Sequence, residues 1–87
     1  MNARELVAWN VRRLRVDRGI SQEALAADAN VDRAYMSRIE RALENPTIGI
    51  LEQIAGVLDA EMVELFRVPL PDEHRPMALP GGRRSKR

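Results

Sequence analysis

Apolar residues recur at helical spacing through most of the chain, and no stretch alternates apolar and polar residues as a β-strand would. Val7, Val11 and Leu14 stand at positions i, i+4 and i+7, which predicts an amphipathic helix over residues 4–18 that ends at Gly19. No Asn-Gly or Asp-Gly hairpin signal is present either. The pattern therefore predicts an all-α fold.

Three further helices are predicted, each after a residue that commonly caps a helix N-terminus. The caps and helices are Ser21 before residues 22–28, Asp32 before residues 33–41, and Thr47 before a fourth helix. That fourth helix carries inward apolar residues at helical spacing, namely Ile48, Leu51, Ile54, Ala55 and Leu58. A short fifth element from Glu61 to Phe66 completes a predicted set of five helices.

The texture of the sequence changes after Phe66. Four prolines are followed by Gly81-Gly82 and a basic end, RRSKR, and such a sequence is incompatible with a packed helix. We therefore expect one folded domain over residues 4–66 and a flexible or extended, Pro-rich and basic-ended tail over residues 67–87.

Composition narrows the function classes. The 87 residues suit a single domain, and its core must be aliphatic because only 3% of the residues are aromatic. There is no cysteine and one histidine, so we expect no disulfide, metal site or cofactor, and no enzyme. No apolar run is long enough to span a membrane, and the N-terminus does not resemble a secretory signal.

Charge is distributed unevenly along the chain. Residues 1–43 carry eight arginines and six acids, whereas residues 44–66 carry five acids and no base. Residues 67–87 carry six bases and two acids. A polyanion would prefer the first and last segments, and the acidic segment would face away from it.

The helix predicted at residues 33–41 has an unusual outward face. At roughly 100° per residue, an arc of roughly 140° contains Arg33, Ala34, Ser37, Arg38 and Arg41. The opposite side is apolar, with Tyr35, Met36 and Ile39. The DNA major groove admits one α-helix, arginine donates two hydrogen bonds to guanine, and an alanine methyl can touch thymine. We therefore predict base contacts by Arg33, Ala34, Ser37 and Arg38, and a phosphate contact by Arg41.

A solvated, arginine-rich helix surface is the alternative explanation for this face. The neighbouring sequence favours DNA binding, because two short helices joined by a three-residue turn form a helix-turn-helix arrangement. Further marks follow one another in order: LR-x-x-RG-x-SQ-x-x-LA at 14–26, S-x-I-E-R at 37–41, NPT at 45–47, I-A-x-x-L at 54–58 and ELF at 64–66. Together they resemble the phage-repressor (Cro/repressor, Xre-like) family.

The resemblance implies a five-helix, lambda-repressor-like domain whose helix-turn-helix unit spans about residues 21–41. It supports base contacts by the four residues named above. It also implies a partly buried ion pair between Arg15 and Glu40. It implies two roles for Gln22, which would bind a DNA phosphate and brace the recognition helix, the third helix. The set assigned to phosphate contact or bracing comprises Ser21, Gln22, Tyr35, Arg41 and Asn45.

One position departs from the family pattern. A glycine usually follows the Glu-Arg pair and ends the third helix in the left-handed conformation. This chain has Ala42 there, so we expect the third helix to run longer or to end differently.

These features predict a sequence-specific regulator of transcription, cytoplasmic and nucleoid-associated, that binds double-stranded DNA. We expect a homodimer, because proteins of this type bind half-sites one helical turn, roughly 34 Å, apart. The dimer surface is assigned to Met62, Val63, Leu65 and Phe66, which could otherwise simply close the core. The small size leaves no room for a small-molecule effector domain and resembles that of restriction–modification controller proteins.

The sequence leaves the function of the tail and the environment of Trp9 open to two interpretations each. The alternative function is an antitoxin-type protein-binding module whose tail folds on a partner protein, with anchors at Val68, Leu70, Met77 and Leu79. Trp9 lies opposite the apolar stripe of the first helix, and it is interpreted either as an exposed side chain or as a contact for the tail or a second subunit.

Overall fold

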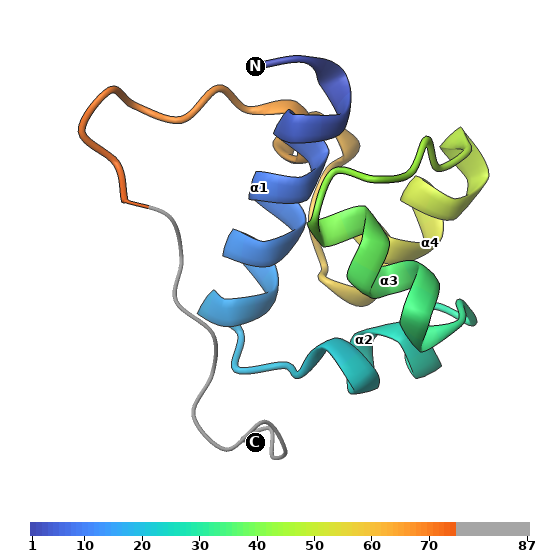
Figure 1. The fold of residues 1–87 in the computed structure, drawn as a ribbon. Helices are drawn as coiled ribbons and strands as arrows, with labels where there is room; N and C mark the ends of the chain where they lie inside the picture. The colour runs from blue at the N-terminus through green and yellow to red at the C-terminus, as the bar shows by residue number, and fades with distance from the viewer. Residues whose placement is uncertain (75–87) are drawn as a thin grey trace.

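The computed structural model describes residues 1–74 and is helical throughout its regular structure (Figure 1). In chain order the elements are α1 (Ala3–Asp17), α2 (Gln22–Asp28), α3 (Arg33–Glu40), α4 (Ile48–Val57) and η1 (Met62–Phe66). The described residues contain no strand, which confirms the all-α class. The fifth element is a 3-10 helix of five residues rather than an α-helix. No helix in this part of the chain is long and apolar enough to cross a membrane.

Side-chain caps fix the start of each α-helix. The Asp32 carboxylate accepts hydrogen bonds from two backbone N–H groups in the first turn of α3. Ser21 and Thr47 cap α2 and α4 in the same manner, and α1 begins with a capping box between Asn2 and Glu5. Because these side chains satisfy backbone donors that have no partner within the helix, the predicted helix starts are confirmed to within a residue or two.

The four α-helices also share one kind of C-terminus. Each is followed by a residue with φ between 54° and 67°, namely Gly19, Asn30, Ala42 and Asp59. In α3 the Leu43 N–H donates to the Arg38 carbonyl at 2.9 Å, and the Ala42 N–H donates to the Ile39 carbonyl at 3.0 Å. This pair of bonds defines the Schellman motif, and the other three helix ends contain the same pair.

The expectation that α3 would run longer or end differently is therefore wrong. Ala42 adopts φ 60°, the conformation that a glycine would take at this position. The Cβ atom makes this conformation unfavourable for an L-residue by roughly 1–2 kcal/mol. The two backbone hydrogen bonds and the short loop to Thr47 hold it there, so α3 ends in the family's manner despite the strain.

Replacing Ala42 with glycine should relieve this strain. We expect Ala42→Gly to raise the free energy of unfolding by about 1 kcal/mol, which is the relieved strain less the extra flexibility of the unfolded chain. Urea denaturation monitored by circular dichroism measures the change. The matched control is Ala27→Gly at an exposed position of α2, which should lower stability because glycine disfavours a helix interior. A loss of stability in both variants would contradict the assigned conformation of Ala42.

The hydrophobic core lies between the helices: α1 packs against α3 and η1, α2 packs against α3 and α4, and α4 also contacts η1. The large side chains of the core are nearly fully buried. They are Val7, Val11, Leu14, Leu25, Met36, Ile39, Leu51, Ile54, Leu58 and Leu65. The predicted inward stripes are thus confirmed with one exception. Ile48 is 74% exposed, because it stands in the first turn of α4 at the edge of the buried stripe.

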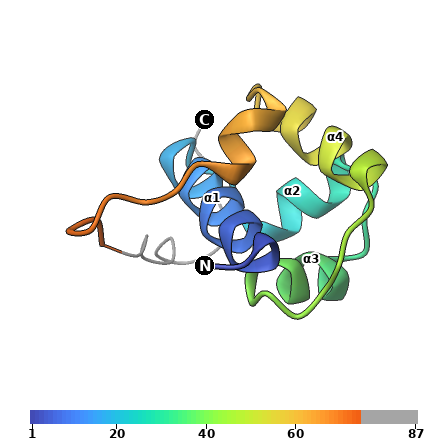
Figure 2. The same ribbon diagram turned by 90° about the horizontal axis from the view of Figure 1, so that it is seen from above.

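A buried asparagine fastens the chain after η1 to α1. Asn10 is fully buried, and its Nδ2 lies 3.1 Å from the Leu65 carbonyl and 2.8 Å from the Arg67 carbonyl. Beyond this point residues 67–74 are extended apart from a turn, and Figures 1 and 2 show them leaving the helical body beside α1, away from α3 and α4. A hydrogen bond from Arg67 lowers the pKa of Glu73 within this segment. The predicted tail beyond residue 74 lies outside the described residues.

Candidate nucleic-acid interface

The outward face of α3 has the composition expected from the helical wheel. Its exposed members are Arg33, Ala34, Arg38 and Arg41, and Ser37 between them is half-buried. Met36 and Ile39 on the other side are fully buried, whereas Tyr35 is half-buried at the boundary. One side of α3 is therefore packed against the core, and the other side turns basic and small residues toward solvent.

A buried ion pair joins α3 to α1. Arg15 Nε lies 2.7 Å from Glu40 Oε2, and Arg15 Nη2 lies 2.9 Å from Glu40 Oε1. The two side chains are only 6% and 1% exposed. The guanidinium and the carboxylate meet in a two-bond fork, the geometry in which such pairs are strongest. The pair that the resemblance implied is thus present in the structure.

The same pair also binds the segment between α1 and α3. Arg15 Nη1 donates to the Ile20 carbonyl at 2.9 Å, and Gln22 Nε2 donates to Glu40 Oε1 at 3.1 Å. Because Gln22 is the first residue of α2, one carboxylate connects α1, α2 and α3. Bracing by Gln22 therefore has a contact as its basis, while its phosphate contact stays a prediction.

Removal of this carboxylate should destabilise the whole domain. We expect Glu40→Ala to lower the free energy of unfolding by roughly 3–5 kcal/mol, because the Arg15 guanidinium would remain buried without its partner. Thermal and urea denaturation measure the loss. The control is Glu23→Ala, which removes an exposed acid from α2 and should change stability by less than about 0.5 kcal/mol. Equal effects of the two substitutions would refute a stabilising role for the pair.

The other residues assigned to phosphates lie on or next to the α2–α3 unit. The Ser21 hydroxyl oxygen accepts a hydrogen bond from the Ala24 N–H at 3.0 Å and keeps its own O–H for donation. Arg41 and Asn45 are exposed in the loop after α3. These positions leave their side chains available, and their contacts with phosphate stay predictions.

Two polar residues were missed by the sequence analysis. Glu44 Oε2 accepts a hydrogen bond from Arg38 Nε at 2.6 Å, although the two residues lie on opposite sides of a helix end. A helical wheel cannot show such a contact, because the loop leaves the helical spiral. Asn10 could have been noticed, since it stands three residues after Val7 and therefore faces the core.

The structure contradicts one residue of the assigned dimer surface. Leu65 is fully buried within the monomer and has no surface left for a partner subunit. Val63 is 74% exposed and Phe66 is 39% exposed, while Met62 is half-buried. Next to Phe66 an apolar hollow of about 230 Å³ extends to Ile48.

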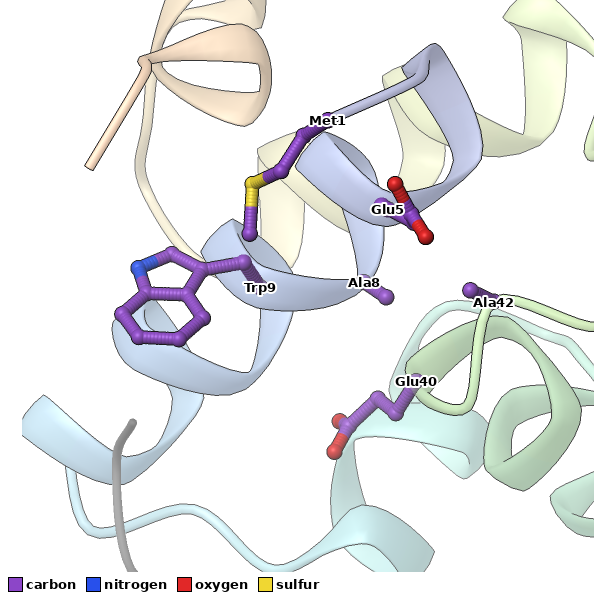
Figure 3. A pocket seen from close by; sticks show the side chains of 6 residues that line it. All are labelled: Met1, Glu5, Ala8, Trp9, Glu40 and Ala42. Carbon is purple, nitrogen blue, oxygen red and sulfur yellow. The ribbon is translucent and has the colours of Figure 1, made fainter. Parts of the chain in front are cut away.

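Trp9 is half-buried, so its interpretation as an exposed side chain is wrong. Its Nε1 is buried, and no residue among 1–74 accepts a hydrogen bond from it. Trp9 and Met1 line one side of a hollow of about 310 Å³, and Glu40 and Ala42 line the other (Figure 3). The hollow lies against the first half of α1 and extends to the end of α3.

Comparison with known proteins agrees with this geometry. The Helix-turn-helix family profile matches residues 11–65. The uncharacterized HTH-type transcriptional regulator y4dJ of Sinorhizobium fredii is 38% identical over 65 residues, which cover 75% of this chain and 84% of the relative. The crystal structure of the hypothetical transcription factor NHTF from Neisseria is similar with a TM-score of 0.75 and 35% identity, covering 78% of each chain.

A second solved structure comes from a regulator of similar size. The restriction–modification controller protein C.AhdI from Aeromonas hydrophila has a TM-score of 0.70 and 35% identity, and the match covers 72% of this chain and 96% of that one. The segment that the family profile matches, residues 11–65, includes the buried ion pair and the outward face of α3. The chain therefore belongs to the Xre-like, phage-repressor type of helix-turn-helix family, whose members are DNA-binding transcription regulators and not enzymes.

Proposed function

We propose that the chain is a sequence-specific regulator of transcription that inserts α3 into the DNA major groove and acts as a homodimer on a two-fold operator. The observation that carries the proposal is the rigid presentation of the α3 face. Met36 and Ile39 anchor its underside, and the Arg15–Glu40 pair holds it against α1. Residues 4–66 form the DNA-binding domain in this proposal.

Each outward residue of α3 has a role that follows from its chemistry. Arg33 and Arg38 donate paired hydrogen bonds to guanine O6 and N7, and Ala34 contacts a thymine methyl group. Ser37 donates to or accepts from a nearby base edge. Both arginines are exposed, so neither needs to leave the interior to reach a base.

Phosphate contacts orient the domain on the duplex. The proposed set lies at the start of α2 and around α3, and it comprises Ser21, Gln22, Tyr35, Arg41 and Asn45. Such contacts fix the register of a protein on DNA without reading its sequence. Because they neutralise phosphates, affinity should fall as the salt concentration rises.

One recognition helix contacts only a few base pairs, and a homodimer doubles the length of DNA that is recognised. Two copies related by a two-fold axis would bind half-sites one helical turn apart, roughly 34 Å. Val63 and Phe66, with half-buried Met62, supply an apolar surface in the acidic segment of the chain. A protein of this kind acts in the cytoplasm on the nucleoid. The similarity to C.AhdI favours a small regulator that responds to its own concentration, as a restriction–modification controller could.

The antitoxin alternative is not favoured. The relatives named above are described as transcription regulators or controller proteins. Of the four tail anchors that it requires, Val68 and Leu70 are exposed, while Met77 and Leu79 lie outside the described residues.

Loss of either base-contacting arginine should reduce affinity in a sequence-dependent manner. On an operator selected from random DNA, Arg33→Ala or Arg38→Ala should weaken binding by roughly 1–3 kcal/mol and relax the preference at one base pair per half-site. Fluorescence anisotropy at one fixed salt concentration measures both effects. Arg4→Ala, at an exposed position of α1, removes the same charge and is the control. Equal weakening on every sequence would assign Arg33 and Arg38 to phosphates instead.

A charge in the apolar surface should separate the proposed subunits. We expect the unaltered chain to sediment at twice its mass of 9.8 kDa, and Val63→Asp to sediment as a monomer, because each dimer would bury two new carboxylates near the two-fold axis. Val68→Asp introduces the same charge at an exposed position outside this surface and should leave the dimer intact. Monomeric behaviour of the unaltered chain at micromolar concentration would contradict the homodimer.

A further inference from the structure

We propose that Glu44 is a positioning residue that holds Arg38 for its base contact and thereby sets sequence specificity. The inference rests on the proposed function. Glu44 lies in the loop between α3 and α4, and the contact that carries the inference is its 2.6 Å hydrogen bond from Arg38 Nε.

Glu44 binds only one of the nitrogen atoms of Arg38, and which nitrogen it binds determines whether Arg38 can still contact a base. A guanidinium carries five N–H donors in a fixed plane, one on Nε and two on each terminal nitrogen. Glu44 Oε2 accepts from Nε, so this bond does not use the end-on edge of the group, which carries one N–H of Nη1 and one N–H of Nη2. This terminal pair can donate side by side to guanine O6 and N7. The Arg38 side chain as a whole is 49% exposed.

The position of Glu44 is fixed by the end of α3 on one side and the start of α4 on the other. The Schellman bond from the Leu43 N–H to the Arg38 carbonyl closes α3 directly before it, and Thr47 caps α4 three residues after it. Its side chain is only 25% exposed. The carboxylate therefore has a defined position before DNA arrives, and an arginine held in advance loses less freedom when it binds a base.

The charge of Glu44 acts in the same direction. A carboxylate beside the groove repels phosphates and offsets the positive charge of Arg38, so it weakens the sequence-independent attraction to any duplex. A contact that weakens wrong complexes while preserving the right one increases specificity. In the described part of the chain, Arg33 and Arg41 form no such ion pair, so Arg38 is distinguished from the other arginines of the face.

The test compares two substitutions that remove the same charge. Glu44→Ala deletes the hydrogen-bond acceptor, and Glu52→Ala deletes an exposed carboxylate from α4. For each variant the dissociation constants for the selected operator and for an unrelated duplex give a specificity ratio. Glu44→Ala should lower this ratio about tenfold and relax the preference at the base pair that Arg38 reads, whereas Glu52→Ala should leave it within about twofold.

A mutant cycle shows whether Glu44 acts through Arg38. In an Arg38→Ala background, Glu44→Ala should change the ratio no further, and Glu44→Gln in the unaltered background should retain most of it, because an amide oxygen can still accept from Nε. An unchanged ratio in Glu44→Ala, or an equal fall in both backgrounds, overturns the inference while the proposed function stands. Failure of the unaltered chain to bind any selected duplex overturns both.

Discussion

A carboxylate inside a small protein must be surrounded by donors, and Glu40 receives three hydrogen bonds from Arg15 and Gln22. The remaining structure depends on this constraint, because the donors come from α1 and α2 while the acceptor sits on α3. Rotation of α3 about its axis would break the fork and leave two charges buried without partners. One rotational setting of α3 is therefore strongly preferred, and in that setting Arg33 and Arg38 point to solvent.

The end of α3 extends this control into the following loop. Ala42 accepts a strained backbone so that the Schellman bonds can form, and the chain then turns at once toward the Thr47 cap. The turn brings Glu44 back to Arg38. The way α3 ends therefore determines a contact made by a side chain of the proposed DNA-binding face.

Local signals in the sequence predicted most of the fold. A helix cap such as Asp32, and the apolar spacing of Val11 and Leu14, depend only on residues a few positions away in the chain. They can therefore be recognised from the sequence alone. The outward face of α3 and the Arg15–Glu40 pair were also anticipated, the pair only through the family resemblance.

One error was local, because an alanine was not expected to adopt the positive φ that ends α3. The other errors arose where separate elements or loops meet. Whether Leu65 closes the core or reaches a second subunit depends on where η1 docks against α1, which spacing does not encode. The exposed Ile48 and the half-buried Trp9 depend in the same way on which neighbours extend past them. Glu44 contacts Arg38 only because the loop folds back, and no periodic pattern describes a loop.

The claim that α3 enters the major groove can be tested directly by methylation interference on a selected operator. Dimethyl sulfate methylates guanine N7 in the major groove and adenine N3 in the minor groove, so one reaction probes both. Guanine methylation should block binding at positions grouped in two half-sites one helical turn apart, while adenine methylation there should not. Binding that tolerates every methylated guanine, or that is blocked by methylated adenine alone, would contradict it.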